Sequence, residues 1–350
     1  MLSGCCSTTE ARLRRFEFKQ PHMGTLFTIT LFAPDAASAK SATDAAFAKI
    51  AALDRMMTDY DPESELMQLC KKPTGQPVRV SDELFDVLRK AQRVAELSDG
   101  AFDVTVGPVV RLWRRARRME TLPAPDQLAR ARESVGWKKL KLEPATKMVT
   151  LTVPNMQLDL GGIGKGFAAD QALEVLKEHG VRRALVAASG DIAAGDPPPG
   201  KRGWRVGIGG LGGTRSSASP SSHGESGTRW NASLPNEPVN SLAGVILLRN
   251  AAVSTSGDRE QFVEIDGKRY SHIVDPRTGI GVTERLQVSV IAKRGVDSDS
   301  FDTAINVLGV ERGLALLESQ PGLAALILRK KGDQTEVIES RRFRQIPRAE

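Results

Sequence analysis

The sequence predicts an α+β fold with largely antiparallel sheets. Strand-like alternation and helix-like periodicity both occur along the 350 residues, but they do not follow each other as a regular βαβ repeat. Extended runs joined by short turns indicate antiparallel hairpins. Hydrophobic residues make up 40% of the chain, which is enough for a sizeable core. A doubly wound parallel sheet is therefore disfavoured, and a single α+β unit with an insertion explains the length better than two domains.

The first predicted elements are two strands and two helices. Residues 12–33 alternate apolar and polar side chains in two runs, which is typical of paired strands. Across 35–57 apolar residues recur at helical spacing, so this helix is expected to lay one face on a sheet. Ser81 is the expected N-cap of a second helix that ends near residues 98–100.

The middle of the chain predicts a hairpin followed by a helix and a strand. The hairpin covers residues 138–153. An apolar strand at Leu158–Leu160 is expected to run into the glycine cluster at 161–166, and a helix then continues to Gly180. Residues 183–188 form another extended apolar run.

Composition divides the chain into parts. Residues 1–11 are an N-terminal segment, 12–335 form the folded domain, and 336–350 form a basic C-terminal tail. Within the domain, residues 209–240 are rich in Gly, Ser, Thr and Pro and have almost no apolar periodicity, which predicts a disordered insertion.

Charge and aromatic content argue against a nucleic-acid partner. The formal net charge of +7 bears on solubility and non-specific attraction rather than on a function. Aromatic residues make up only 5% of the chain, which leaves few side chains for base stacking. The arginine-rich stretch 111–118 could contact phosphates or acidic lipid, but a solvated basic face is the preferred interpretation. No nucleic-acid binding is therefore expected.

The N-terminus carries a short box with a cysteine. Leu2-Ser3-Gly4-Cys5 resembles the end of a bacterial lipoprotein signal, although the charged and apolar segments of such a signal do not precede it here. No run of about 18 apolar residues that could span a bilayer occurs. With an upstream signal, the expectation is lipidation at Cys5 and an inner-membrane lipoprotein facing the periplasm. Without one, the expectation is the cytoplasm.

The glycine cluster is the first of three constellations that carry chemistry. Glycines let the backbone approach a ligand closely, and the following helix N-terminus favours anions such as phosphate. The cluster is not a Walker sequence, because Lys165 is followed by Gly166 rather than by Ser or Thr. A phosphate-bearing ligand and a plain flexible turn both remain open.

The second constellation is a polar turn that contains His272. It joins the stretches 253–259 and 269–279, which bring hydroxyls, a histidine and an Asp-Pro-Arg-Thr-Gly turn together. His272 is one of four histidines in the chain, and both a structural and a proton-transfer role remain open.

The third constellation is acidic and enters a predicted helix at residues 297–303. Asp299 and Thr303 are four residues apart, so on a helix they share one face and offer two hard oxygen ligands. A divalent cation such as Mg²⁺ fits this pair, and an ordinary helix N-cap is the alternative.

Taken together and in order, these stretches resemble the ApbE family of flavin transferases, which attach FMN from FAD to a protein threonine. The resemblance runs through most of residues 20–320. The motifs that carry it are Met23-Gly24-Thr25, Tyr60–Glu65, Ser98–Pro108, Asp159–Gly166, Ser189-Gly190-Asp191, Ser254–Gly257, His272–Gly279 and Asp299–Thr303. It implies a single T-fold-like catalytic domain.

The resemblance also implies FAD as substrate, Mg²⁺ as cofactor and a set of site residues. It implies FAD contacts by Met23, Tyr60, Ala101, Phe102, Asp103, Asp159, Lys165 and Val274. The implied Mg²⁺ ligands are the backbone carbonyl of Gly162 and the side chains of Asp299 and Thr303. His272 is the candidate acceptor of the hydroxyl proton.

The implied reaction is Mg²⁺-dependent transfer of FMN to a threonine hydroxyl of a target flavoprotein subunit, with release of AMP. Two alternatives stay open: a Mg²⁺-dependent pyrophosphatase that splits FAD into FMN and AMP, and a non-catalytic flavin-binding protein. Members of the family are commonly exported lipoproteins, which supports Cys5 as a membrane anchor.

Overall fold

The structure is a computed structural model that describes residues 13–209, 242–257 and 262–349. Cys5 and nearly all of the predicted insertion lie outside these residues, so neither expectation is tested here. In the described part of the chain, no helix is long and apolar enough to cross a membrane.

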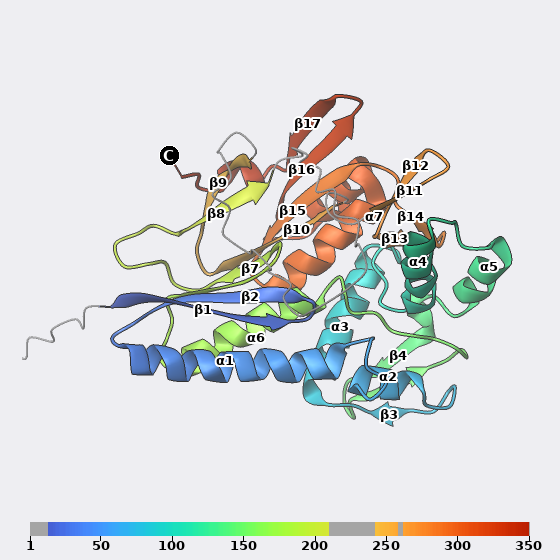
Figure 1. Cartoon of the computed structure of the whole chain (residues 1–350), viewed down its shortest axis with the longest axis horizontal. Helices are drawn as coiled ribbons and strands as arrows, with labels where there is room; N and C mark the ends of the chain where they lie inside the picture. Colours follow the sequence, from blue (N-terminus) through green and yellow to red (C-terminus); the bar gives the residue numbers. More distant parts are fainter. Residues whose placement is uncertain (1–12, 210–241, 258–261, 350) are drawn as a thin grey trace, which may run out of the picture.

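An antiparallel sheet of eight strands organises the fold (Figure 1). Its spatial order is β1-β2-β6-β7-β10-β15-β16-β17, and neighbouring strands are antiparallel throughout. The strands are β1 Arg14–His22, β2 Thr25–Ala33, β6 Ala184–Ala188, β7 Asp191–Ala194, β10 Ala251–Gly257, β15 Leu286–Ala292, β16 Ala324–Lys331 and β17 Gln334–Glu339. With the helices below, this sheet confirms the predicted α+β class.

Helices cover one face of the large sheet, where α1 packs on β1 and β2, and α6, which lies beside α1, packs on β6 and β7 (Figure 1). The helices are α1 Ala36–Met57, α2 Glu65–Cys70, α3 Asp82–Leu97, α4 Gly107–Met119, α5 Pro125–Glu133, α6 Gly164–Glu178 and α7 Gly295–Ser319. The main core lies between this layer and the sheet, with Ile29, Ile50, Phe167 and Val288 buried in it. The predicted N-cap of α3 is present, since the Ser81 side chain accepts the backbone N–H of Leu84, and the Asp35 side chain caps α1 in the same way by accepting the N–H of Ser38.

Short strands and turns complete the molecule. They are β3 Val78–Arg79, β4 Leu140–Glu143, β5 Met148–Leu151, β8 Trp204–Gly209, β9 Leu242–Leu248, β11 Phe262–Ile265, β12 Lys268–Ser271, β13 Val274–Asp275 and β14 Ile280–Gly281, with the short helices η1 Trp137–Lys139 and η3 Phe343–Gln345. The β4–β5 hairpin confirms the predicted one. The β8–β9 hairpin covers the second face of the large sheet, where Trp204 and Val206 pack near Leu185 and Val253.

Two parts of the chain differ from expectation. The strand predicted at Leu158–Leu160 is wrong, because these residues belong to no strand. Gln157 forms an isolated bridge with Val106 just before α4, the Asp159 N–H donates to Val104 O at 2.8 Å, and the chain continues as a loop into α6. Residues 336–349 do not form the predicted tail, because they remain packed against the domain. Strand β17 pairs with β16 as far as Glu339, and the buried Phe343 packs under the β8–β9 hairpin.

Helices α6 and α7 cross where two glycines meet, and this contact gives the first prediction. A Cβ on Gly166 would lie 2.1 Å from the carbonyl oxygen of Gly295, a backbone atom that cannot move aside alone. We expect Gly166→Ala to lower the free energy of unfolding by at least about 2 kcal/mol, measured by urea denaturation.

The matched control is Gly164→Ala, two positions earlier on the same helix. A Cβ there would meet only the flexible end of Met57, at 3.8 Å. We expect it to change stability by less than about 1 kcal/mol in either direction. Equal losses in both variants would show that the α6–α7 crossing is not the tight contact described here.

Candidate active site

A cavity of about 1800 Å³ lies at the end of helices α6 and α7 and brings all of the predicted site residues together. They reach it from segments far apart in the chain. They are Met23 between β1 and β2, Tyr60 after α1, Ala101, Phe102 and Asp103 before α4, Asp159, Gly162 and Lys165 around the start of α6, His272 and Val274 near β13, and Asp299 and Thr303 on α7.

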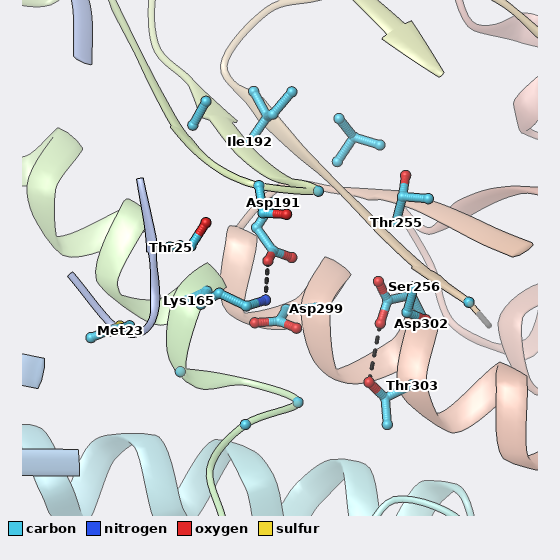
Figure 2. A pocket seen from close by; sticks show the side chains of 18 of the residues that line it. Met23, Thr25, Lys165, Asp191, Ile192, Thr255, Ser256, Asp299, Asp302 and Thr303 are labelled. Atoms are coloured by element: carbon cyan, nitrogen blue, oxygen red, sulfur yellow. Dashed lines mark hydrogen bonds and ion pairs between the residues drawn. The ribbon is translucent and has the colours of Figure 1, made fainter. Parts of the chain in front are cut away.

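Carboxylates gather at the inner end of this cavity. Asp299 and Asp302 come from the first turns of α7, and Asp191 begins β7. All three are buried, and one oxygen from each lies within 4.8 Å of the others. Figure 2 shows Lys165, Asp191 and Asp299 converging. Asp302 and Thr303 lie further along α7, the helix that carries Asp299. This group could hold a cation or a ligand that carries one.

The carboxylates outnumber the positive charge next to them. Lys165 pairs with Asp191. Burial lowers the pKa of the lysine, but the negative charges of Asp191 and Asp299 raise it by more, so the pKa lies above its ordinary value. Burial raises the pKa of Asp299 to about 7, and the charge of Asp191 adds to this shift. Burial and the charge of Asp299 also raise the pKa of Asp302. A divalent cation here would relieve the repulsion.

The oxygen donors suit a hard cation such as Mg²⁺. The Thr303 hydroxyl donates to Asp302 Oδ1 at 3.2 Å, and Asp299 Oδ2 accepts from the Gly166 N–H at 2.9 Å. A Cβ on Gly162 would lie 3.0 Å from Thr303 Oγ1, so only a glycine brings the backbone this close to the hydroxyl. The residues predicted for Mg²⁺ therefore lie together.

Asp191 and Asp302 join this cluster but were not assigned by the sequence analysis. Asp302 lies inside the Asp299–Thr303 motif, three residues after Asp299, so helical periodicity could have placed both on neighbouring faces. Asp191 ends the Ser189-Gly190-Asp191 motif, but only tertiary contacts place β7 beside α7 and so bring this carboxylate to the cluster.

An arginine organises the outer end of the cavity. Arg114 Nη2 donates to Asp159 Oδ2 at 2.9 Å, and its other terminal nitrogen pairs with Asp59. Its guanidinium lies 4.6 Å from the ring centroid of Tyr60, which is 77% exposed. For Arg114 the interpretation of 111–118 as a solvated basic face is wrong, because α4 turns this side chain towards two half-buried carboxylates, Asp59 and Asp159.

Among the remaining predicted residues, some polar groups already form hydrogen bonds within the protein. Met23 has a left-handed backbone (φ 49°), and its N–H donates to Asp54 Oδ2 at 2.8 Å. Asp103 is buried and accepts from the backbone N–H and the hydroxyl of Thr105, both at 2.8 Å. Burial raises its pKa to about 6. Asp103 therefore braces its own turn, while the half-buried His272 lines the cavity.

Comparison with known proteins gives consistent matches. A model described as the ApbE family matches residues 23–327. A protein named FAD:protein FMN transferase from Treponema pallidum (strain Nichols) is 32% identical over 327 residues, covering 91% of this chain and 85% of its own. One with the same name from Klebsiella pneumoniae (strain 342) is 27% identical, with coverage of 98% and 93%. The structure of "Flavin Transferase ApbE from Vibrio cholerae" is similar, with a TM-score of 0.80 at 26% identity, covering 95% of this chain and 99% of that one.

The bridging role of Arg114 can be tested by stability. Replacing it in Arg114→Gln leaves Asp59 and Asp159 facing each other without a cation. We expect a loss of about 1–2 kcal/mol at pH 7, smaller than for a fully buried pair because Arg114 is partly exposed. The exposed neighbour provides the control: Arg115→Gln should stay within about 0.5 kcal/mol. Equal denaturation midpoints for the two variants would contradict the bridge.

Proposed function

Because the chain belongs to the ApbE family, we propose that it transfers the FMN part of FAD to a threonine hydroxyl of a target protein and releases AMP. The observation that carries the proposal is that a buried oxygen cluster, a half-buried lysine and an exposed tyrosine all line one cavity. The names of the relatives, FAD:protein FMN transferase, support FAD as the substrate.

The cavity offers a suitable group to each part of FAD. Tyr60 and Met23 present flat and polarizable surfaces to a ring system. Lys165 brings positive charge to the pyrophosphate, and the N-terminus of α6 adds backbone N–H groups with the same preference for anions. The Asp59–Arg114–Asp159 network holds the outer rim in place beside Tyr60.

Asp299, Thr303 and the carbonyl of Gly162 would hold Mg²⁺, with Asp302 and Asp191 beside them. Bound there, Mg²⁺ would offset negative charge on the phosphate oxygens. This assignment is supported by the all-oxygen donor set. The raised pKa of Asp299 supports it too, because it reflects burial and repulsion from Asp191, which a cation would offset.

The proposed step is a displacement at phosphorus. The threonine oxygen forms a bond to the FMN-side phosphorus, and the bond from that phosphorus to the bridging oxygen breaks, so that AMP leaves with the electron pair. The hydroxyl proton passes to a base, for which His272 is the candidate because it lines the cavity. Lys165, which Asp191 keeps cationic, stabilises the developing charge.

We also propose a setting for the reaction. The acceptor is a flavoprotein subunit at the membrane, and a lipid on Cys5 holds the chain in the cell envelope. The support for this setting is the Leu2–Cys5 box in the sequence.

The function is tested by covalent labelling. The purified chain, FAD and Mg²⁺ are added to a membrane fraction of the source organism, and proteins are read by flavin fluorescence in a denaturing gel. The protein in the labelled band is identified by mass spectrometry. It is then purified in its flavin-free form and used as the acceptor in the rate measurements. We expect Asp299→Asn and His272→Ala each to lower the transfer rate by about 10²-fold or more.

The control is Asp297→Asn, a change of the same kind two residues away whose side chain does not line the cavity. Its rate should stay within about twofold of wild type. Release of FMN and AMP with no labelled protein would show that the chain hydrolyses FAD instead of transferring FMN. Wild-type rates in Asp299→Asn would remove that residue from the site.

Metal binding should depend on pH. A carboxyl group must lose its proton to bind a metal, and burial holds the pKa of Asp299 at about 7. The Kd for Mg²⁺, measured by calorimetry, should therefore rise up to about tenfold for each pH unit below 7 and level off above it. A Kd that stays constant between pH 5.5 and 7 would contradict this assignment.

A further inference from the structure

Asp159 lies between the arginine network at the outer end of the cavity and the glycine loop before α6. Its two carboxylate oxygens have different partners. Oδ2 accepts from Arg114 Nη2 at 2.9 Å, and Oδ1 accepts from the backbone N–H of Gly161 at 2.8 Å. One side chain therefore connects helix α4 with the loop that carries Gly162, whose carbonyl is assigned to Mg²⁺ under the proposed function.

Backbone hydrogen bonds hold the two ends of this loop. Before it, the N–H of Asp159 donates to Val104 O at 2.8 Å. After it, the N–H of Gly164 donates to Leu160 O at 2.8 Å where α6 begins. Between these bonds, the peptide of Gly161 is held by the Asp159 carboxylate, which accepts from its own backbone two residues further on. This contact therefore fixes the middle of the loop.

The loop fits closely between that carboxylate and helix α7. A Cβ on Gly161 would lie 2.9 Å from Asp159 Oδ1. On the other side, a Cβ on Gly162 would lie 3.0 Å from Thr303 Oγ1 and 3.3 Å from Phe102 Cε2. Because the loop is in contact on both sides, a displaced Asp159 would let the Gly162 carbonyl move relative to Thr303.

Arg114 keeps the Asp159 carboxylate in place. Its guanidinium pairs with both Asp59 and Asp159, whose side chains are only 11% and 10% exposed. Burial and the charge of Asp59 raise the pKa of Asp159, and Arg114 opposes this shift. Without the guanidinium, two carboxylates with little access to water would repel each other. The Asp159 side chain would then turn away from Asp59 and lose its fixed position against the loop.

We propose that Arg114 is a positioning residue for the cation: by holding Asp159 against the N–H of Gly161, it fixes the loop that presents the Gly162 carbonyl to Mg²⁺. The inference rests on the proposed function, in which that carbonyl is a ligand. Partners that orient the ligands of a metal typically change its affinity by about 10–100-fold. The same guanidinium lies 4.6 Å from the ring centroid of Tyr60, so one side chain connects the exposed rim with the inner site.

The sign of the effect separates positioning from charge. Loss of a positive charge from the cavity would, by charge alone, strengthen the attraction for a cation and lower the Kd for Mg²⁺. Loss of the loop position acts in the opposite direction, because a ligand oxygen is no longer held in place. A higher Kd after removal of Arg114 therefore reports the position of the loop.

The test measures Mg²⁺ binding to the purified full chain by calorimetry, without FAD and with folding checked by circular dichroism. We expect Arg114→Gln to raise the Kd for Mg²⁺ by about tenfold. Asp59→Asn removes the other partner of the arginine but leaves the bond to Asp159, so its Kd should stay within about twofold of wild type. An unchanged or lower Kd in Arg114→Gln, or an equal rise in Asp59→Asn, would overturn the proposal.

The matched control is Arg115→Gln, which removes the same charge from the next residue of α4, an exposed position outside the cavity. Its Kd for Mg²⁺ should equal that of wild type. A tenfold rise in this variant as well would show that the effect does not depend on the contact with Asp159, and would also overturn the proposal.

Gly161→Ala approaches the same contact from the loop and keeps Arg114. The backbone of Gly161 lies outside the left-handed region, and the atom that its Cβ would meet is the end of a flexible side chain, so we expect the chain to fold. Its Kd for Mg²⁺ should also rise about tenfold. Combined with Arg114→Gln, it should add no more than about twofold, because both changes break one contact. Effects that multiply to about 100-fold would contradict a shared route through Asp159.

The transfer reaction gives a second readout. Because the loop is displaced but the ligands remain, saturating Mg²⁺ should restore the transfer rate of Arg114→Gln to within about threefold of wild type. A rate that stays at least tenfold lower at saturating Mg²⁺ would place the arginine in the transfer step, against the proposal.

The two proposals fail in different ways. If the wild-type chain binds no Mg²⁺ and labels no protein in the fluorescence gel, the proposed function fails. If it does both, but Arg114→Gln binds Mg²⁺ as tightly as wild type, only the positioning role of Arg114 fails.

Discussion

The site depends on one close contact, the crossing of α6 and α7 at Gly166 and Gly295. A Cβ on either glycine would lie 2.1 or 2.6 Å from the carbonyl oxygen of the other, so both positions need glycine. Asp170, one turn further on α6, accepts the N–H groups of Gly295 and Val296 at 2.7 and 3.0 Å and so caps α7. The crossing brings Lys165 and Asp299 to the same point. The positions of the charged groups are therefore set by backbone packing.

That packing imposes an electrostatic cost. Three buried carboxylates face one lysine, and burial with mutual repulsion raises the pKa of Asp299 and Asp302. Such an arrangement adds little to stability by itself, because the desolvation of the charges is not fully offset. Under the proposed function, a bound cation and phosphate would offset this cost, as expected of a preorganised site for phosphoryl transfer. The same groups would be a poor choice for a purely structural core.

Local signals in the sequence were enough to predict several helices and strands and most of the site residues. Apolar periodicity predicted α1, and periodicity with the N-cap Ser81 predicted α3, because the information for a helix lies within a few turns. The site residues recognised from short motifs meet in one cavity, since each motif holds its own local geometry. Arg114 and Asp191 were not assigned because their roles depend on partners brought by tertiary contacts, such as Asp159, 45 positions from Arg114. Apolar character alone also suggested a strand at Leu158–Leu160, where the fold offers no neighbouring strand to pair with.

The inner end of the cavity is thus built by the first turns of two helices, α6 and α7. The central claim is that the inner end holds a divalent cation between α7 and the glycine loop before α6. The most direct measurement is anomalous diffraction from crystals grown with Mn²⁺ in place of Mg²⁺. A single peak bounded by Asp299, Thr303 and the carbonyl of Gly162 is the predicted result. A peak elsewhere, or none at these residues with Mn²⁺ in excess, would contradict the claim.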